Sequence, residues 1–188
     1  MAPSRQTPRL STLALPPPPL LPVRRALTAR LGTPRRFYQI LEQPAPLAGC
    51  EYPYRFENWS CLRDLGFQNI VCLASETPSY DPTPLKLLGA LELDDLSVLQ
   101  TPDDPTAEAK RIRGIALQIA RALQSREGVL VHCAAGRGRT GAVLGVALRL
   151  LGLSANEIIG YLDDLHRDRS GRGWPESPWQ ARLVRRTR

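Results

Sequence analysis

The chain has 188 residues, of which 43% are hydrophobic, so we expect one domain with a sizeable core. No apolar run approaches the roughly 18 residues that cross a membrane, so no membrane span is expected. The formal net charge is +7, and the first 41 residues alone hold seven arginines and no acid. The rest of the chain holds 18 basic and 18 acidic residues, so no nucleic-acid partner is expected.

The N-terminal segment differs from the rest of the chain. Residues 16–19 are four consecutive prolines, which neither continue a helix nor join a central strand. An arginine-rich, acid-free start is also typical of a mitochondrial transit peptide, but the prolines oppose the amphipathic helix that such a peptide needs. We therefore expect residues 1–35 to be a disordered basic tail ahead of a domain over 36–188, in a cytoplasmic protein. Mitochondrial import is the alternative.

Strand and helix patterns alternate along the remaining chain. Residues 46–54 read as a turn-rich link, and residues 94–109 as an acidic loop running into a helix. We expect strands over 36–41, 68–73, 90–93 and 128–131, and helices over 58–65, 105–124, 140–151, 156–167 and 178–184. The alternation predicts an α/β fold with a mainly parallel central sheet.

Helix starts are marked by capping residues. Asp104 before a proline suits an N-cap and a first turn, and Ser154 with Glu157 suits a capping box. Ser177 before a proline begins the last short helix.

The cysteines are not arranged for zinc. Cys50, Cys61, Cys72 and Cys133 form no CxxC pair, and the chain holds only two histidines. We therefore assign no metal and no cofactor, and expect reduced thiols because no secretory signal is visible.

The stretch VLVHCAAGRGRTGAV, residues 129–143, joins a buried-strand pattern to a helix through a glycine-rich turn. Gly136, Gly138 and Gly141 spell GxGxxG, the dinucleotide-binding fingerprint. That fingerprint opens the first βαβ unit of its fold, whereas this turn lies late in the chain. The acidic pair about 20 residues on also falls in a helical pattern instead of ending a strand. We therefore reject a dinucleotide site.

The same turn places Arg139 six residues after Cys133, and we call residues 133–139 the cysteine loop. Backbone N–H groups between a strand and a helix, with the helix dipole, bind a phosphate dianion. The same field stabilises a thiolate, so we expect Cys133 to ionise well below pH 8.5, about where a free cysteine titrates. Arg139 can grip two phosphate oxygens through a bidentate fork. Thr140 can donate a hydrogen bond to the sulfur, and His132 is expected to orient the loop instead of acting as a base.

The segment HCAAGRGRTG, residues 132–141, resembles the HCxxGxxR[ST]G signature of cysteine-dependent protein tyrosine and dual-specificity phosphatases. The resemblance covers roughly residues 37–188, and the short length suits the compact dual-specificity branch. It implies a twisted sheet flanked by helices and no metal. It also implies that the Cys133 thiolate attacks phosphorus and forms a phosphocysteine. The phosphate oxygens are then bound by the loop residues Ala134, Ala135, Gly136, Arg137, Gly138 and Arg139.

The resemblance requires an aspartic acid that protonates the leaving oxygen. Asp95 is the first choice because compact members carry a strand, one polar residue and then the acid. Asp94 and Asp103 remain open, the latter because it follows a proline as in other members.

Other positions bear on substrate and regulation. Arg137 resembles the basic loop residues of phosphoinositide-type members, but those usually carry two, so a polyanionic substrate is not favoured. The alternative for Arg137 is a solvated residue on the loop rim. Gln180 resembles a glutamine that positions water, with the helix surface as the alternative. Cys72 resembles a second cysteine that traps an oxidised nucleophile as a disulfide, with a packed core cysteine as the alternative. Trp174 and Trp179 are expected to pack the C-terminal segment on the body.

The predicted function is hydrolysis of phosphotyrosine, and of phosphoserine or phosphothreonine, in proteins by a monomeric enzyme. One alternative is a non-protein phosphomonoester: a phosphoinositide, a nucleotide or RNA 5′ end, or a sugar phosphate. The other is a non-catalytic phosphate-binding module, which the intact Cys133, Arg139 and Thr140 oppose.

Overall fold

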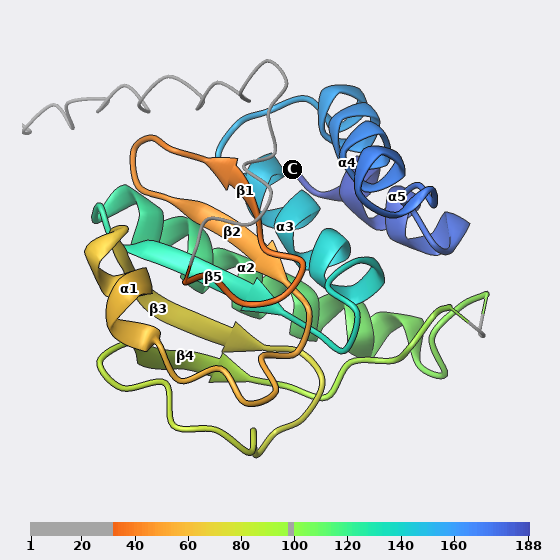
Figure 1. The fold of residues 1–188 in the computed structure, drawn as a ribbon. Coiled ribbons are helices and arrows are strands. Elements are labelled where there is room, and N and C mark those ends of the chain that lie inside the picture. Colours follow the sequence, from red (N-terminus) through yellow and green to blue (C-terminus); the bar gives the residue numbers. More distant parts are fainter. Residues whose placement is uncertain (1–31, 98–99) are drawn as a thin grey trace, which may run out of the picture.

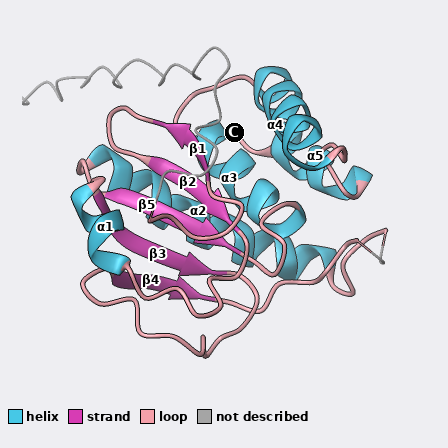
Figure 2. Ribbon diagram, viewed as in Figure 1, coloured by secondary structure: helices cyan, strands magenta, loops and turns pink. Residues whose placement is uncertain are grey.

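A computed structural model describes residues 32–97 and 100–188, so most of the predicted tail, residues 1–31, lies outside the described part. The described part has one five-stranded sheet with helices on both faces (Figures 1 and 2). The strands are β1 Tyr38–Leu41, β2 Leu47–Cys50, β3 Phe67–Cys72, β4 Lys86–Ala90 and β5 Gly128–His132. The helices are α1 Trp59–Asp64, α2 Pro105–Gln124, α3 Gly138–Leu150, α4 Ala155–Ser170 and α5 Pro178–Arg186.

The strand order is β1-β2-β5-β3-β4, and only β1 runs antiparallel to its neighbour. The mainly parallel α/β fold predicted from the sequence is therefore confirmed. His132 at the end of β5 is in register with Cys50 of β2 and Cys72 of β3. The carboxyl ends of these three parallel strands therefore meet at one edge of the sheet, which is where open α/β sheets bind ligands.

The central strand β5 is buried on both faces, as expected for a parallel sheet. Val129 and Val131 face a large core shared with α2, α3, α4 and α5, whereas Leu130 faces a smaller core formed with α1. This alternation follows the two-residue period of a strand. Figure 1 shows α1 on one face of the sheet and α2 and α3 on the other.

The predicted helix caps are confirmed. The Asp104 carboxylate accepts hydrogen bonds at 3.0 Å from the backbone N–H groups of Thr106 and Ala107 at the start of α2. Ser154 and Glu157 form the capping box of α4, and Ser177 caps α5. In the described part of the chain, no helix is both long and apolar enough to cross a membrane.

Several element boundaries differ from the sequence prediction, among them the following three. Residues 47–50, predicted as part of a turn-rich link, form the fully buried strand β2 between β1 and β5. The strand predicted over 90–93 lies earlier, at Lys86–Ala90, where it pairs with β3 from Asn69 onward. Helix α3 begins at Gly138, two residues before the predicted start. For the two strands, the pairing of distant segments outweighs the local pattern.

Candidate active site

The cysteine loop is held by long-range hydrogen bonds and one obligatory glycine. Gly136 has a φ of +67°, and a Cβ at this position would lie 2.2 Å from the carbonyl oxygen of Cys50, so only glycine fits. The hydroxyl of the fully buried Tyr38 donates to the Gly136 carbonyl at 2.9 Å. The backbone N–H of Tyr52 donates to the Ala134 carbonyl at 3.0 Å. These contacts hold the loop against the β1–β2 side of the sheet.

Helix α3 directs its N-terminus at the loop. It runs for 13 residues from Gly138, which gives it a full macrodipole. Its N-cap residue is Arg137, and no side chain of the described residues caps this helix start. The first backbone N–H groups are therefore available to an anion in the loop.

Cys133 lies directly after β5 and is a free cysteine that is only 2% exposed. Thr140, in the first turn of α3, is fully buried. Its hydroxyl has no hydrogen-bond partner within the described ranges, so the predicted bond to the sulfur is not formed in this structure. The loop therefore presents a shielded thiol with a buried, unengaged hydroxyl on the adjoining helix.

Arg139 connects the cysteine loop to the segment that follows β4. Its Nη2 lies 2.9 Å from Oδ2 of Asp95, and its Nη1 donates to the Leu93 carbonyl at 3.5 Å. Oδ1 of Asp95 also accepts from the backbone N–H of Ser97 at 3.1 Å. The structure therefore brings Asp95, of the three predicted acids, to the arginine of the loop.

The other two candidate acids bond to each other and to α2. The Asp94 carboxylate accepts from the backbone N–H of Asp103 at 3.0 Å, and the Asp94 backbone N–H donates to the buried Glu108 at 2.9 Å. These bonds fold the acidic loop onto the start of α2. Neither Asp94 nor Asp103 has an ion pair with Arg139 in the described structure.

His132 is fully buried at the end of β5. Its Nε2 lies 2.5 Å from the Tyr80 hydroxyl, and its ring is edge-on to Tyr52 with the centroids 5.1 Å apart. Burial lowers the pKa of His132 to about 4, although the backbone of Cys133 acts in the opposite direction. The ring is therefore neutral near pH 7, which fits an orienting role better than proton transfer.

Arg137 is not a solvated residue on the loop rim, the alternative considered for it. Its side chain is 18% exposed, and its Nε donates to Oε1 of Glu176 at 2.6 Å. A Cβ on Gly138 would lie 1.5 Å from Oε2 of the same glutamate, so the small loop residue makes room for this pair.

Trp174 and Trp179 pack the C-terminal segment on the body of the domain, as predicted. Trp174 is 1% exposed and its Nε1 donates to the Gly138 carbonyl at 3.3 Å, while Trp179 also belongs to the large core. Gln180 is buried, so a position on the helix surface is wrong. Its Oε1 accepts from the backbone N–H of Ser177 at 3.3 Å, which completes the cap of α5.

Cys72 and Cys50 flank the end of β5 on the two neighbouring strands. Both are buried free thiols, and burial raises the pKa of each. The described residues contain no group of three or more His, Cys, Asp or Glu side chains that could hold a metal ion.

Three residues that shape the site had no signal in the sequence: Tyr38, Tyr80 and Glu176. Their hydrogen-bond partners lie 98, 52 and 39 sequence positions away, respectively. A single chain offers no local pattern that marks such pairs.

Comparison with known proteins agrees with this geometry. The family model of the Swiss Army Knife protein, DSP-PTPase phosphatase domain (PTP-SAK), matches residues 34–170. No curated protein matches the sequence. Among solved structures, the fold is similar to the human tyrosine phosphatase-like serine/threonine/tyrosine-interacting protein, with 18% identity, 73% of this chain and 87% of that chain covered, and a TM-score of 0.53.

Two further structures share the fold at similar distance. One is a kinase associated phosphatase whose catalytic cysteine is replaced by serine, with 18% identity, 81% and 93% of the two chains covered, and a TM-score of 0.51. The other is the core catalytic domain of the PP-IP phosphatase SIW14 from S. cerevisiae in complex with citrate, with 18% identity, 82% and 87% covered, and a TM-score of 0.50. The structures support the fold, and the family model, which spans more than half of the chain, decides the family. This chain belongs to the dual-specificity-type phosphatase domains of the cysteine-dependent protein tyrosine phosphatase superfamily.

Proposed function

We propose that this chain hydrolyses phosphate monoesters through a phosphocysteine intermediate on Cys133. The observation that carries the proposal is the Arg139–Asp95 ion pair at 2.9 Å. The ion pair supports a role for Asp95, which follows β4, in chemistry at the cysteine loop, where a thiol and a helix N-terminus already lie. We also propose residues 36–188 as the phosphatase domain and residues 1–35 as its tail.

The first step transfers the phosphoryl group to sulfur. The Cys133 thiolate attacks phosphorus in line, an S–P bond forms, and the P–O bond to the leaving group breaks. Asp95, protonated in the complex, donates its proton to the leaving oxygen. In the second step water attacks phosphorus, Asp95 accepts a proton from that water, and the S–P bond breaks to return the thiolate.

The loop stabilises the charge that develops on the phosphoryl oxygens. Backbone N–H groups of residues 134–139 and the dipole of α3 supply fixed donors, and the Arg139 fork binds two oxygens at once. Thr140 would donate to the thiolate when it leaves phosphorus in the second step. His132, held by Tyr80, acts as a positioning residue.

The family resemblance favours phosphotyrosine, phosphoserine or phosphothreonine in proteins as substrates. A specific observation favours the second candidate class, a non-protein phosphate ester. Four arginines surround a pocket that the cysteine loop helps to form.

Hydrolysis of a small aryl phosphate by the full chain tests the proposed reaction. The wild-type chain should turn it over, and Cys133→Ser should not. Because Cys133→Ser keeps the loop amides and Arg139, it should still bind inorganic phosphate in a calorimetric titration. Turnover by Cys133→Ser at the wild-type rate, or phosphate binding by the wild type without any turnover, would contradict the proposal.

A further inference from the structure

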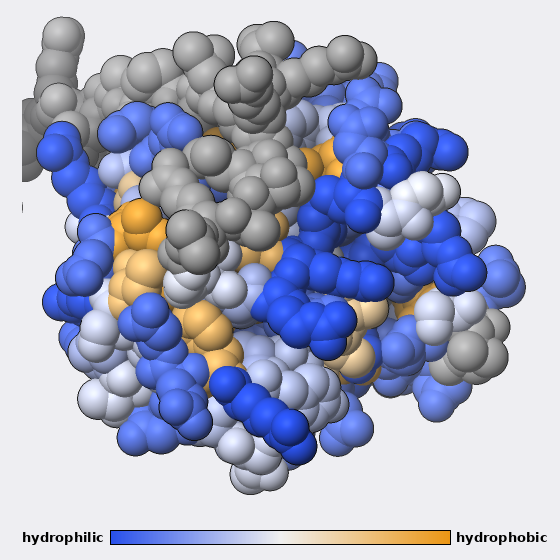
Figure 3. Space-filling view, viewed as in Figure 1, coloured by the Kyte–Doolittle hydropathy of each residue, from blue (hydrophilic) through white to orange (hydrophobic). Residues whose placement is uncertain are grey.

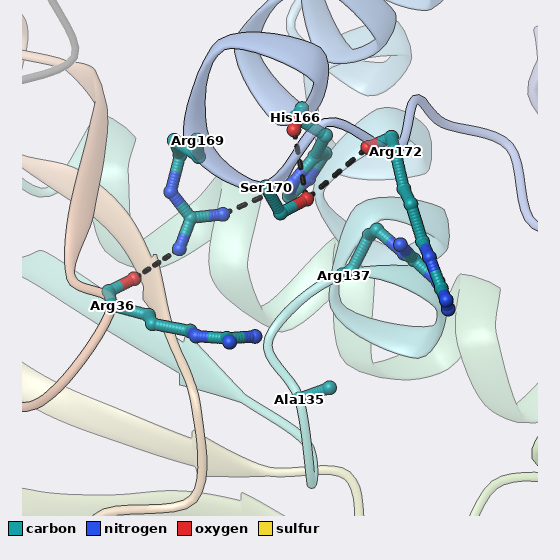
Figure 4. A pocket seen from close by; sticks show the side chains of 7 residues that line it. All are labelled: Arg36, Ala135, Arg137, His166, Arg169, Ser170 and Arg172. Atoms are coloured by element: carbon teal, nitrogen blue, oxygen red, sulfur yellow. Dashed lines mark hydrogen bonds between the residues drawn. The ribbon is translucent and has the colours of Figure 1, made fainter.

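A basic pocket of about 240 Å³ lies beside the cysteine loop. Its lining includes Arg36, Arg137, Arg169 and Arg172, and no carboxylate side chain of the described residues lines it. Figure 4 shows these arginines arranged around one opening above Ala135. They come from the segment before β1, from the loop itself, and from the end of α4 and the residues after it, so the fold gathers charge from three separate parts of the chain.

The arginines around the pocket outnumber the acidic side chains that pair with them. Glu176 pairs with Arg137, and Glu51 lies 3.6 Å from Arg36 but is shared with Arg35 at 3.1 Å. Neither Arg169 nor Arg172 forms an ion pair within residues 32–97 and 100–188. The pocket therefore keeps a positive potential that attracts anions.

Arg169 is held in place by neighbours that leave its charge uncompensated. Its guanidinium stacks 4.0 Å over the ring of Tyr38, the residue whose hydroxyl holds the loop at Gly136. It also donates to the Arg36 carbonyl and lies 3.0 Å from Nδ1 of His166. A fixed guanidinium loses little conformational freedom when it binds an anion.

His166 helps to fix the position of Arg169 at the pocket. The residue is fully buried and lines the pocket. Because a guanidinium can only donate, Nδ1 accepts from Arg169, which leaves the proton of the neutral ring on Nε2. The neutral ring therefore holds Arg169 without compensating its charge, and its buried Nε2 has no hydrogen-bond partner among the described residues.

The pocket is continuous with the site of the proposed reaction, because Ala135 and Arg137 belong both to its lining and to the cysteine loop. The sheet order places Arg36, before β1, and Asp95, after β4, on opposite sides of β5. An anion bound in the pocket therefore leaves Asp95 uncovered.

We infer that this pocket binds a second phosphate group of the substrate, so the chain acts on small polyols that carry phosphates on neighbouring carbons. The inference rests on the proposed function. Because the pocket and the cysteine loop share Ala135 and Arg137, two phosphates close together on one face, as on adjacent ring carbons, suit them best. Successive side chains of an extended peptide point to opposite faces, so a doubly phosphorylated peptide fits less well. The same headgroup could be free or attached to a lipid.

Activity of the full chain on matched substrates tests the inference. The panel is a polyphosphorylated cyclitol, its monophosphate, a short-chain phosphoinositide bisphosphate, a doubly phosphorylated peptide and a small aryl phosphate. The variant Arg172→Gln changes an exposed pocket residue outside the proposed catalytic machinery, and Arg182→Gln removes the same charge from an exposed position on α5 that does not line the pocket. Figure 3 shows many strongly hydrophilic residues on this face of the molecule, over the region of α4 and α5.

We expect Arg172→Gln to lower kcat/KM for the cyclitol polyphosphate by about ten- to a hundredfold, the loss typical of a charge-assisted contact. Its aryl phosphate activity should stay unchanged, and Arg182→Gln should match the wild type on all substrates. Comparing the free cyclitol with the phosphoinositide then identifies the source of the headgroup. Equal losses on the aryl phosphate and the polyphosphate, no loss on either, or a preference for the peptide would overturn the inference.

Calorimetric binding separates this inference from the proposed reaction. In a Cys133→Ser background, Arg172→Gln should weaken binding of the cyclitol polyphosphate by the same factor and leave that of inorganic phosphate unchanged. If no substrate is hydrolysed but this selective loss is seen, the proposed reaction fails and the pocket assignment stands. If the aryl phosphate is hydrolysed but the binding loss is absent, the pocket assignment fails alone.

Discussion

Arg139 and Asp95 form an ion pair with 2.9 Å between Nη2 and Oδ2, across 44 positions of sequence. Partial burial raises the pKa of Asp95, but the hydrogen bonds from Ser97 and the charges of Arg139 and Arg137 outweigh it and hold that pKa below its ordinary value. A phosphate dianion bound to Arg139 would neutralise the charge of its guanidinium and place a negative group beside the Asp95 carboxyl. The pKa of Asp95 would then rise, which favours the protonated form that the leaving group needs.

Replacing Asp95 with Asn should lower kcat by about 10²- to 10⁴-fold for a poor leaving group, the usual contribution of a general acid. The loss should shrink for an activated aryl phosphate, whose oxygen leaves without a proton. Since the acid must be protonated in the complex, kcat of the wild type should fall as pH rises through the raised pKa of Asp95, and this limb should be absent in Asp95→Asn. Steady-state kinetics against pH measure both.

Asp103→Asn is the matched control, because it removes a carboxylate from the same loop without touching Arg139. It should retain near wild-type kcat with every leaving group. If Asp103→Asn loses the pH limb and Asp95→Asn keeps it, the acid has been assigned to the wrong residue.

Gly136→Ala should destabilise the fold by about 2 kcal/mol or more, because it combines a positive φ with overpacking against backbone. The added Cβ would lie 2.2 Å from the Cys50 carbonyl oxygen and 2.7 Å from the Glu51 nitrogen. Gly114→Ala is the control: it lies inside α2 with nothing within 4 Å of the added Cβ, and should stabilise the chain by roughly 0.5–1 kcal/mol. Urea unfolding compares them, and equal stability of the two variants would refute the loop geometry.

The buried histidines should make the fold sensitive to mild acid. Burial lowers the pKa of His132 to about 4 and of His166 to about 3, against about 6.5 in an unfolded chain. Below pH 6.5 the unfolded state therefore binds protons that the folded state does not, and the free energy of unfolding falls as pH falls. The fall should reach roughly 2 kcal/mol per histidine at about pH 5, where carboxylates with lowered pKa values still contribute little.

Urea unfolding at about pH 7 and about pH 5 measures this loss. His166→Gln should lose about half as much stability between these pH values as the wild type, because one of the two titrating rings is gone. An equal loss in the two proteins would mean that His166 is not a neutral buried ring.

Cys72, which is in register with the residue before Cys133, yields a redox prediction. Peroxide would oxidise the Cys133 thiolate to a sulfenic acid, and the Cys72 thiol would then displace water from that sulfur to form a disulfide. Cys50 offers a control, since it is in register with His132 from the other side. Peptide mapping without reductant should find Cys72–Cys133 in the wild type and in Cys50→Ser, but not in Cys72→Ser. Reversible loss of activity without this peptide would count against a role for Cys72.

Local patterns in the sequence predicted the elements whose signals are local. Helix α2 extends from Pro105 to Gln124 as predicted, because its apolar stripe and its Asp104 cap lie within one segment. Strand β2 could not be predicted, because Leu47–Cys50 has no β-branched residue and becomes a strand through pairing with β1 and β5. Strand β4 was misplaced because it is a partly exposed edge strand, and the neighbouring residues 90–93 alternate more regularly.

The active site likewise contains residues with a local sequence signal and residues that only the fold brings together. Spacing alone indicated Cys133 and Arg139, whereas three aspartates stayed open until the fold joined Asp95 to Arg139 and Asp94 to Asp103. The pairing of Arg137 with Glu176 depends on a contact across 39 positions. The sequence indicated Arg137, but no local pattern indicated Glu176, the carboxylate that partly neutralises it.

The central claim is that Cys133 is the nucleophile, and rapid acid quench with mass spectrometry tests it most directly. Wild-type chain mixed with an aryl phosphate and quenched within its first turnovers should carry one phosphoryl group on the peptide that contains Cys133, and Cys133→Ser should carry none on that peptide. A phosphoryl group on another residue, or product released while Cys133 remains unmodified at every quench time, would contradict the mechanism.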